Sequence, residues 1–141
     1  PTVNNDRKYA GYYGALQVCN NKYYSLVDAV SQHIGEANTV TASSTDDGVK
    51  AVARADFVVL ALGDDLLVER EGSDRKSISF PESQLNTVNK IAAASKRPVI
   101  LVILSGATMD VSPFLNNPKV GAILYSGQPS VAVLGVGDVI F

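Results

Sequence analysis

Three short, unbroken runs of apolar residues constrain the fold of this chain more than any other feature of its sequence. They occupy residues 57–62, 99–104 and 120–125. Each run has the length of a β-strand that is buried on both faces, and it is far shorter than the roughly 20 residues that span a bilayer. The segments between the runs carry apolar residues at helical spacing. This alternation predicts an α/β fold with a mostly parallel sheet sandwiched between helices.

Helix signals flank these runs. Ser25 and Asp28 form a capping box, which predicts a helix over residues 25–34. The other expected elements are a short strand over residues 39–43 and helices over residues 45–55, from residue 81 onward and over residues 130–141. Together they predict a single α/β-sandwich domain over residues 1–141. Because the chain begins without a methionine and stops inside a predicted helix, we expect a fragment of a larger chain, truncated at both ends.

The composition narrows the function classes. Lysine and arginine number 12 against 14 for aspartate and glutamate, so the net charge is −2 and no basic stripe exists for binding phosphates. We therefore expect no nucleic-acid partner, and the shortness of the apolar runs predicts no membrane partner. Cys19 is the only cysteine and His33 the only histidine, which excludes an internal disulfide, a Cys/His zinc site and a histidine-dependent catalytic triad. Any acid–base chemistry must use carboxylates.

A long connection follows the first apolar run, from Gly63 to Phe80. It far exceeds the usual two to six residues or so of a strand-to-helix link, and ligands bind beyond the carboxyl ends of parallel strands. Its charged residues are Asp64, Asp65, Glu69, Arg70, Glu71, Asp74 and Arg75. The residues alone leave three interpretations open: a solvated loop, a metal site or a general acid. Charged residues lie mostly at the protein surface, which favours the solvated loop. The spacing of the carboxylates does not fit a calcium-binding loop.

Several short motifs occur in a fixed order over nearly the whole chain. The segment 68–75 ends in Glu-Gly-Ser-Asp-Arg, and Pro81 and Gln84 follow it. The other motifs occupy residues 11–14, 102–106, 110–112, 118–125 and 138–141. In this order they resemble the second, C-terminal α/β-sandwich domain of glycoside hydrolase family 3, the β-glucosidase and β-xylosidase group. The resemblance implies a flavodoxin-like sandwich that follows a (β/α) barrel in a longer chain.

The resemblance also implies a function. Members of this family are retaining, exo-acting β-glycosidases that hydrolyse O-glycosidic bonds with two carboxylates. The nucleophile is an aspartate of the barrel, so the isolated domain is expected to be inactive. By motif match the acid/base is Glu71, with Glu69 as the runner-up. Asp74 and Arg75 are expected to bind substrate or support the loop, Arg75 by pairing with Asp74 or another carboxylate; a weak surface ion pair is the alternative.

The expected partners follow from the same resemblance. They are a β-linked oligosaccharide or glycoside substrate and the barrel domain of the parent chain, with no cofactor and no metal ion. An extracellular, vacuolar or lysosomal location is also suggested. Two other classes of protein remain possible. One is a non-enzymatic binding or interaction module on the same fold, and the other is a family member that has lost its catalytic carboxylates and serves only for binding or interaction. The presence of Glu71 in its motif argues against this loss.

Overall fold

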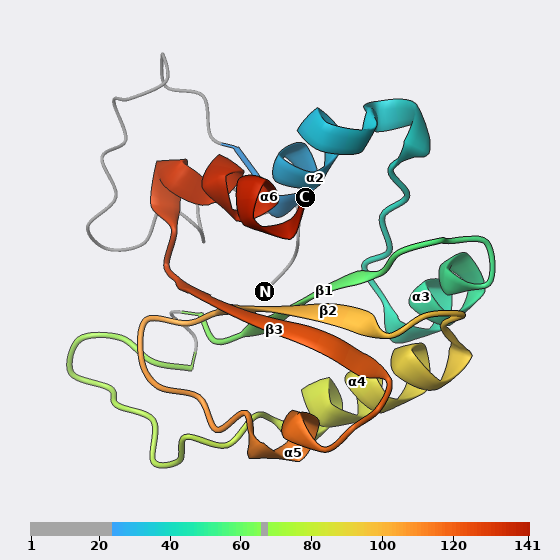
Figure 1. Cartoon of the computed structure of the whole chain (residues 1–141). Helices are drawn as coiled ribbons and strands as arrows, with labels where there is room; N and C mark the ends of the chain where they lie inside the picture. Colours follow the sequence, from blue (N-terminus) through green and yellow to red (C-terminus); the bar gives the residue numbers. More distant parts are fainter. Residues whose placement is uncertain (1–23, 66–67) are drawn as a thin grey trace.

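The computed structural model describes residues 24–65 and 68–141, and its centre is a parallel sheet (Figure 1). The three strands are β1 (Val59–Gly63), β2 (Val99–Leu104) and β3 (Val120–Gly127). They lie in the order β1-β2-β3, with every neighbouring pair parallel. The predicted α/β fold with a mostly parallel sheet is confirmed.

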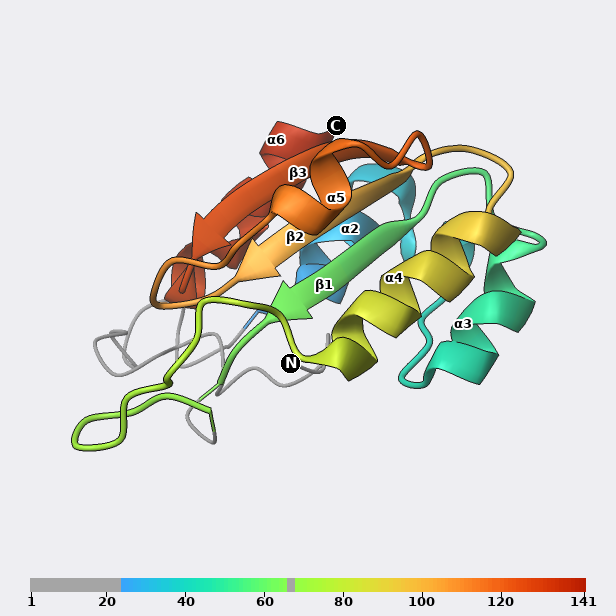
Figure 2. The same ribbon diagram turned by 90° about the horizontal axis from the view of Figure 1, so that it is seen from below.

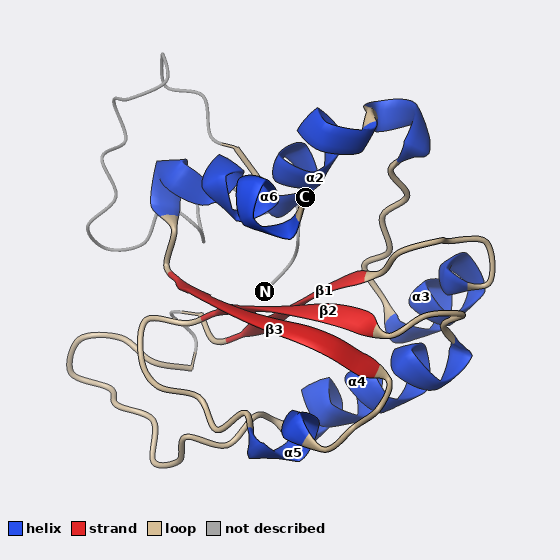
Figure 3. Ribbon diagram, in the orientation of Figure 1, coloured by secondary structure: helices blue, strands red, loops and turns tan. Residues whose placement is uncertain are grey.

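Helices cover both faces of this sheet (Figure 3). On one face lie α2 (Leu26–Ile34) and α6 (Leu134–Ile140), and α6 continues directly from the 3-10 helix η3 (Ser130–Val133). On the other face lie α3 (Thr45–Val52), α4 (Glu82–Ala94) and α5 (Ser112–Leu115). No helix in the described part of the chain is long and apolar enough to cross a membrane.

The central strand β2 explains why two helical layers are needed. Its side chains alternate between the faces, as the period of a strand requires. Val99, Leu101 and Ile103 belong to the core on the α4 side, whereas Val102 and Leu104 belong to the core on the α2 and α6 side. All five are buried, so each face of the sheet loses its contact with water only when its own helices are in place.

Local signals in the sequence set the start of the first described helix. The Ser25 hydroxyl accepts a hydrogen bond from the Asp28 amide at 3.2 Å, and the Asp28 carboxylate accepts one from the Ser25 amide at 2.7 Å. The predicted capping box is therefore present, and α2 begins at Leu26. Gly35, with φ of +85°, follows the helix in a conformation that favours glycine.

Two sequence predictions about strands are wrong. The expected strand over residues 39–43 does not form: a short 3-10 helix, η2 (Glu36–Asn38), precedes this segment. The Thr39 hydroxyl donates to the Gly35 carbonyl at 2.9 Å, so a local hydrogen bond competes with strand formation. The third apolar run was also expected to be buried on both faces. Instead β3 is one of the two outer strands of the described sheet, and Gly121, Ala122 and Tyr125 are exposed.

The boundaries of three further elements differ from the prediction. The helix expected over residues 45–55 forms as α3, which ends at Val52. The first run was expected to form a strand from residue 57, but β1 begins at Val59. Phe57 lies before it, 64% exposed, with the Arg97 guanidinium 5.0 Å from the centre of its ring. The helix expected over residues 130–141 begins as the 3-10 helix η3 and becomes α-helical only at Leu134.

Candidate functional site

The long loop between β1 and α4 lies at the carboxyl edge of the sheet. All three strands are parallel, so their carboxyl ends share this edge. Figure 2 shows the loop extending beyond the arrowhead of β1 and returning to the start of α4. The sequence analysis looked for ligand-binding residues after the strands at this edge, and the charged loop follows β1 here.

Gln84 closes the base of the loop. It lies on α4, where its side-chain oxygen accepts from the Gly63 amide at 3.0 Å and its side-chain nitrogen donates to the Gly63 carbonyl at 2.7 Å. Gly63 has φ of +135°, and a Cβ atom at this position would lie 1.9 Å from the Leu104 carbonyl oxygen. The two ends of the loop are thus joined by two hydrogen bonds of the Gln84 side chain, at a position where the backbone conformation and the close approach to Leu104 require a glycine.

Arg75 connects the outer part of the loop to the sheet. Its side chain is only 11% exposed. Its Nε atom lies 2.9 Å from Glu69 Oε2, and its Nη1 atom lies 3.4 Å from Asp64 Oδ2. The same guanidinium donates hydrogen bonds to the Thr108 carbonyl and to the Met109 sulfur. Arg75 therefore holds two carboxylates of its own loop against the segment that follows β2.

The expected partner of Arg75 is only partly the observed one. Within residues 24–65 and 68–141, Arg75 forms ion pairs with Asp64 and Glu69 and none with Asp74, which is exposed. Asp64 was not singled out from the sequence, although its position directly after β1 was a usable signal. Its side chain is 6% exposed, which makes it the more deeply buried of the two carboxylates.

The two candidate acid/base residues lie in different surroundings. The Glu69 side chain is 30% exposed; its Oε2 is buried in the ion pair with Arg75 and accepts no aligned hydrogen bond from the described residues. Glu71 is exposed. It lies in a two-residue turn, closed by hydrogen bonds between Arg70 and Ser73 of 3.1 and 2.9 Å, with Gly72 at φ of +75°. Glu69 is thus oriented by Arg75, and Glu71 is an exposed residue of a turn.

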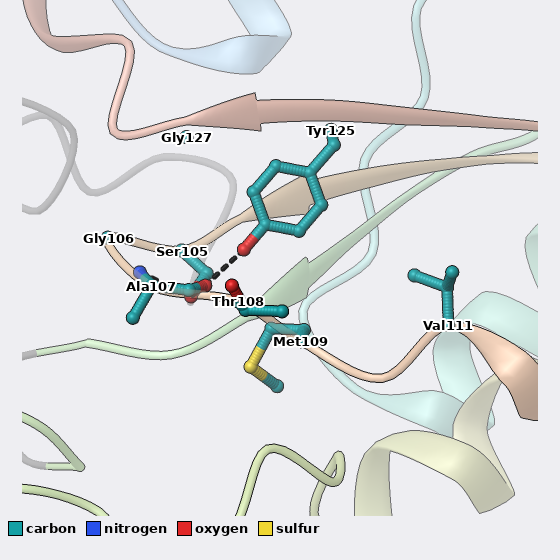
Figure 4. Close-up of a pocket in the computed structure, with 8 residues that line it drawn as sticks. All are labelled: Ser105, Gly106, Ala107, Thr108, Met109, Val111, Tyr125 and Gly127. Atoms are coloured by element: carbon teal, nitrogen blue, oxygen red, sulfur yellow. Dashed lines mark hydrogen bonds between the residues drawn. The ribbon is translucent and has the colours of Figure 1, made fainter.

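A shallow cavity of about 510 Å³ lies beside this loop (Figure 4). It is lined by residues 105–109, Val111, Tyr125 and Gly127. Tyr125 is 43% exposed, and its hydroxyl donates to the Ala107 carbonyl. Because Thr108 and Met109 both line the cavity and bind Arg75, the cavity and the loop belong to one continuous surface at the carboxyl edge.

One further carboxylate near this edge, Asp110, has a shifted pKa. Hydrogen bonds from the Ser112 side chain and backbone amide lower the pKa of Asp110 below its usual value. No group of three His, Cys, Asp or Glu side chains in the described ranges is arranged to hold a metal ion. The motif at residues 11–14 and the lone Cys19 lie outside the described residues.

Comparisons with known proteins give one consistent result. Residues 2–141 match the glycosyl hydrolase family 3 C-terminal domain. Beta-D-xylosidase 3 of Arabidopsis thaliana is 35% identical over 133 residues, which cover 92% of this chain and 17% of that protein. Beta-xylosidase/alpha-L-arabinofuranosidase 1 of Medicago sativa subsp. varia is 44% identical over 97 residues, which cover 68% of this chain and 12% of that protein.

A solved structure agrees with the fold. A GH3 exo-beta-xylosidase in complex with a xylobiose aziridine activity-based probe matches 99% of this chain and 19% of its own, with a TM-score of 0.81 and 23% identity. At this identity the likeness speaks for the fold alone, and it agrees with the α/β sandwich. The chain spans less than a fifth of the length of the proteins named here.

Proposed function

Because the chain belongs to glycosyl hydrolase family 3, as a C-terminal domain of that family, we propose that it supplies the acid/base carboxylate of a retaining, exo-acting β-glycosidase. The observation that carries this proposal is the loop at the carboxyl edge, where a buried arginine holds a partly exposed glutamate. The relatives described above are named β-xylosidases, so a β-linked xyloside is the first substrate class to test.

The proposed chemistry needs a second carboxylate from another domain. In a retaining glycosidase, a nucleophile attacks the anomeric carbon while a carboxylic acid about 5 to 5.5 Å away protonates the departing glycosidic oxygen. The resulting carboxylate then takes a proton from water, which displaces the sugar from the nucleophile and restores the acid. We assign the nucleophile to a barrel domain of the parent chain. On this proposal the domain alone does not turn over substrate.

The geometry favours Glu69 over Glu71 for this role, which reverses the order from the motif match. A catalytic group works best when its orientation is fixed before the substrate arrives. Arg75 fixes one carboxylate oxygen of Glu69, and the side chain keeps 30% exposure through which a substrate can reach it. Glu71 is exposed on the turn and has a contact of its own, so the preference rests on the burial of the ion pair between Glu69 and Arg75. We therefore take Glu69 as the first candidate and Glu71 as the second.

Kinetics of the full-length parent protein test both candidates. Glu69→Gln and Glu71→Gln are each compared with wild type on xylobiose, whose leaving group needs a proton, and on a dinitrophenyl β-xyloside, whose leaving group does not. Loss of general acid catalysis costs about 10²- to 10⁴-fold in rate. We expect Glu69→Gln to lose activity on xylobiose by this factor. Added azide is expected to restore turnover of the dinitrophenyl substrate and give xylosyl azide, because azide attacks without a general base.

A matched control and two opposite outcomes complete the test. Asp46→Asn removes an exposed carboxylate from the first turn of α3, on a helix that is not part of this edge, and is expected to leave both rates unchanged. If Glu71→Gln instead shows the selective loss on xylobiose and gives xylosyl azide, Glu71 is the acid/base, as the motif match predicted, and Glu69 is a supporting residue. If the parent binds xylosides but turns over none, the domain serves binding or interaction.

A further inference from the structure

We propose that Asp64 is a positioning residue of this site and acts on Glu69 through Arg75; this inference rests on the proposed function. Asp64 directly follows β1, and its amide donates to the Leu104 carbonyl at 3.2 Å. Its backbone is thereby tied to β2, and its side chain is 6% exposed. Asp64 is the charged partner that fixes Arg75 to the sheet.

The remaining contacts of Arg75 show what this anchoring achieves. The guanidinium donates to the Thr108 carbonyl, and the neighbouring Ala107 carbonyl accepts from the Tyr125 hydroxyl of β3 and from the Ser105 hydroxyl, the latter at 2.6 Å. The segment after β2 is thus held from both sides. Arg75 therefore has fixed partners directly after β1 and after β2, and in that position its Nε atom lies next to Glu69.

A count of charges gives Asp64 a second role. The cluster comprises Arg75 with one positive charge and two carboxylates, Asp64 and Glu69. Asp64 alone balances the guanidinium. Without it, Glu69 would be the only carboxylate left to compensate a largely buried positive charge, and breaking that pair would be costly. Because Asp64 balances the charge of Arg75, Glu69 is oriented by Arg75 without being needed to compensate the guanidinium charge.

The experiment uses the full-length parent and one ratio: kcat/KM for xylobiose divided by kcat/KM for the dinitrophenyl xyloside. For Asp64→Asn we expect this ratio to fall about 10- to 100-fold, since small misplacements of a catalytic group have effects of that size. The thermal midpoint of unfolding should stay close to that of wild type. Asp110→Asn is the matched control, because it removes a carboxylate at the same edge that hydrogen-bonds only to Ser112 among the described residues.

A double variant shows whether Asp64 acts through Glu69. If it does, Asp64→Asn added to Glu69→Gln lowers the ratio no further, because the group that it positions is already gone. A further fall in the double variant overturns the inference. So does a ratio that stays at the wild-type value in Asp64→Asn while Glu69→Gln lowers it. An equal loss on both substrates together with a lower thermal midpoint means a purely structural role, which also overturns it.

Arg75→Lys keeps the test decisive if Asp64→Asn does not fold. Lysine retains the charge, but its ammonium group lacks the planar fork that reaches Asp64, Glu69 and the Thr108 carbonyl together. We expect the ratio to fall in the same way, and an unchanged ratio contradicts the inference. Failure of the proposed function has a different signature: Glu69→Gln itself then leaves the ratio unchanged, and Asp64 has no acid/base at this position to act on.

Discussion

The sheet and the charged loop at its carboxyl edge are held by different kinds of contact. Leu101, Val102 and Ile103 of β2 have no exposure to solvent, and they pack between two layers of helices. The outer loop is held through polar contacts, such as those of the Arg75 guanidinium and the hydrogen bond of 2.9 Å that the Asp110 amide donates to the Ile78 carbonyl. Apolar packing is spread over many atoms and has little directionality, whereas ion pairs and hydrogen bonds depend on one geometry. Substitutions in the sheet should therefore affect the whole fold, and substitutions around Arg75 should act locally.

The largest effect is expected where the two regions meet, at Gly63. In Gly63→Ala the new Cβ atom would lie 1.9 Å from the Leu104 carbonyl oxygen, and the φ of +135° is one that L residues rarely adopt. The strands would have to separate, so we expect a destabilisation of more than about 3 kcal/mol, seen as loss of soluble protein or a much lower thermal midpoint.

Gly72 provides the matched control for this substitution. It also has a positive φ, +75°, but nothing lies within 4 Å of where its Cβ atom would be. Gly72→Ala therefore contains the backbone strain without the clash, and we expect a loss of about 1 kcal/mol. Similar losses for the two variants would show that the close approach of β1 and β2 is not the decisive contact, and the contrast between sheet and loop would weaken.

An intermediate and local effect is expected for Arg75→Met. Methionine keeps an unbranched apolar stem but leaves the buried Asp64 carboxylate without its partner, which favours opening of the loop by about 1 to 3 kcal/mol. The sheet does not depend on this contact, so the thermal midpoint should change little. Trypsin cleavage after Arg70 or Lys76, both in exposed parts of the loop, should become at least about 5-fold faster. Unchanged cleavage would mean that other contacts hold the loop.

The same contrast explains which features the sequence predicted. Apolar runs and helix caps are local patterns, so the parallel strands and the capping box at Ser25 were predicted correctly. The segment 39–43 carries residues typical of strands, but a strand also needs a partner, and no pattern within five residues supplies one. No local sequence pattern predicted Asp64 as a partner of Arg75 either. Asp74 is adjacent in sequence, whereas Asp64 approaches Arg75 only because the loop folds back on the end of β1.

The smallest effect is expected for an ion pair that has the same chemistry without the burial. Lys50 Nζ lies 3.7 Å from Asp47 Oδ1 on α3, with side chains 77% and 62% exposed. Water and salt screen such a pair, so Lys50→Ala should change the free energy of unfolding by less than about 0.5 kcal/mol and should not alter trypsin cleavage in the loop. Thermal unfolding at low and moderate salt measures this. A loss in Lys50→Ala as large as the cost of loop opening in Arg75→Met, which trypsin cleavage measures, would show that charge alone sets the effect. A negligible loss assigns the difference to burial and to the number of partners that one guanidinium reaches.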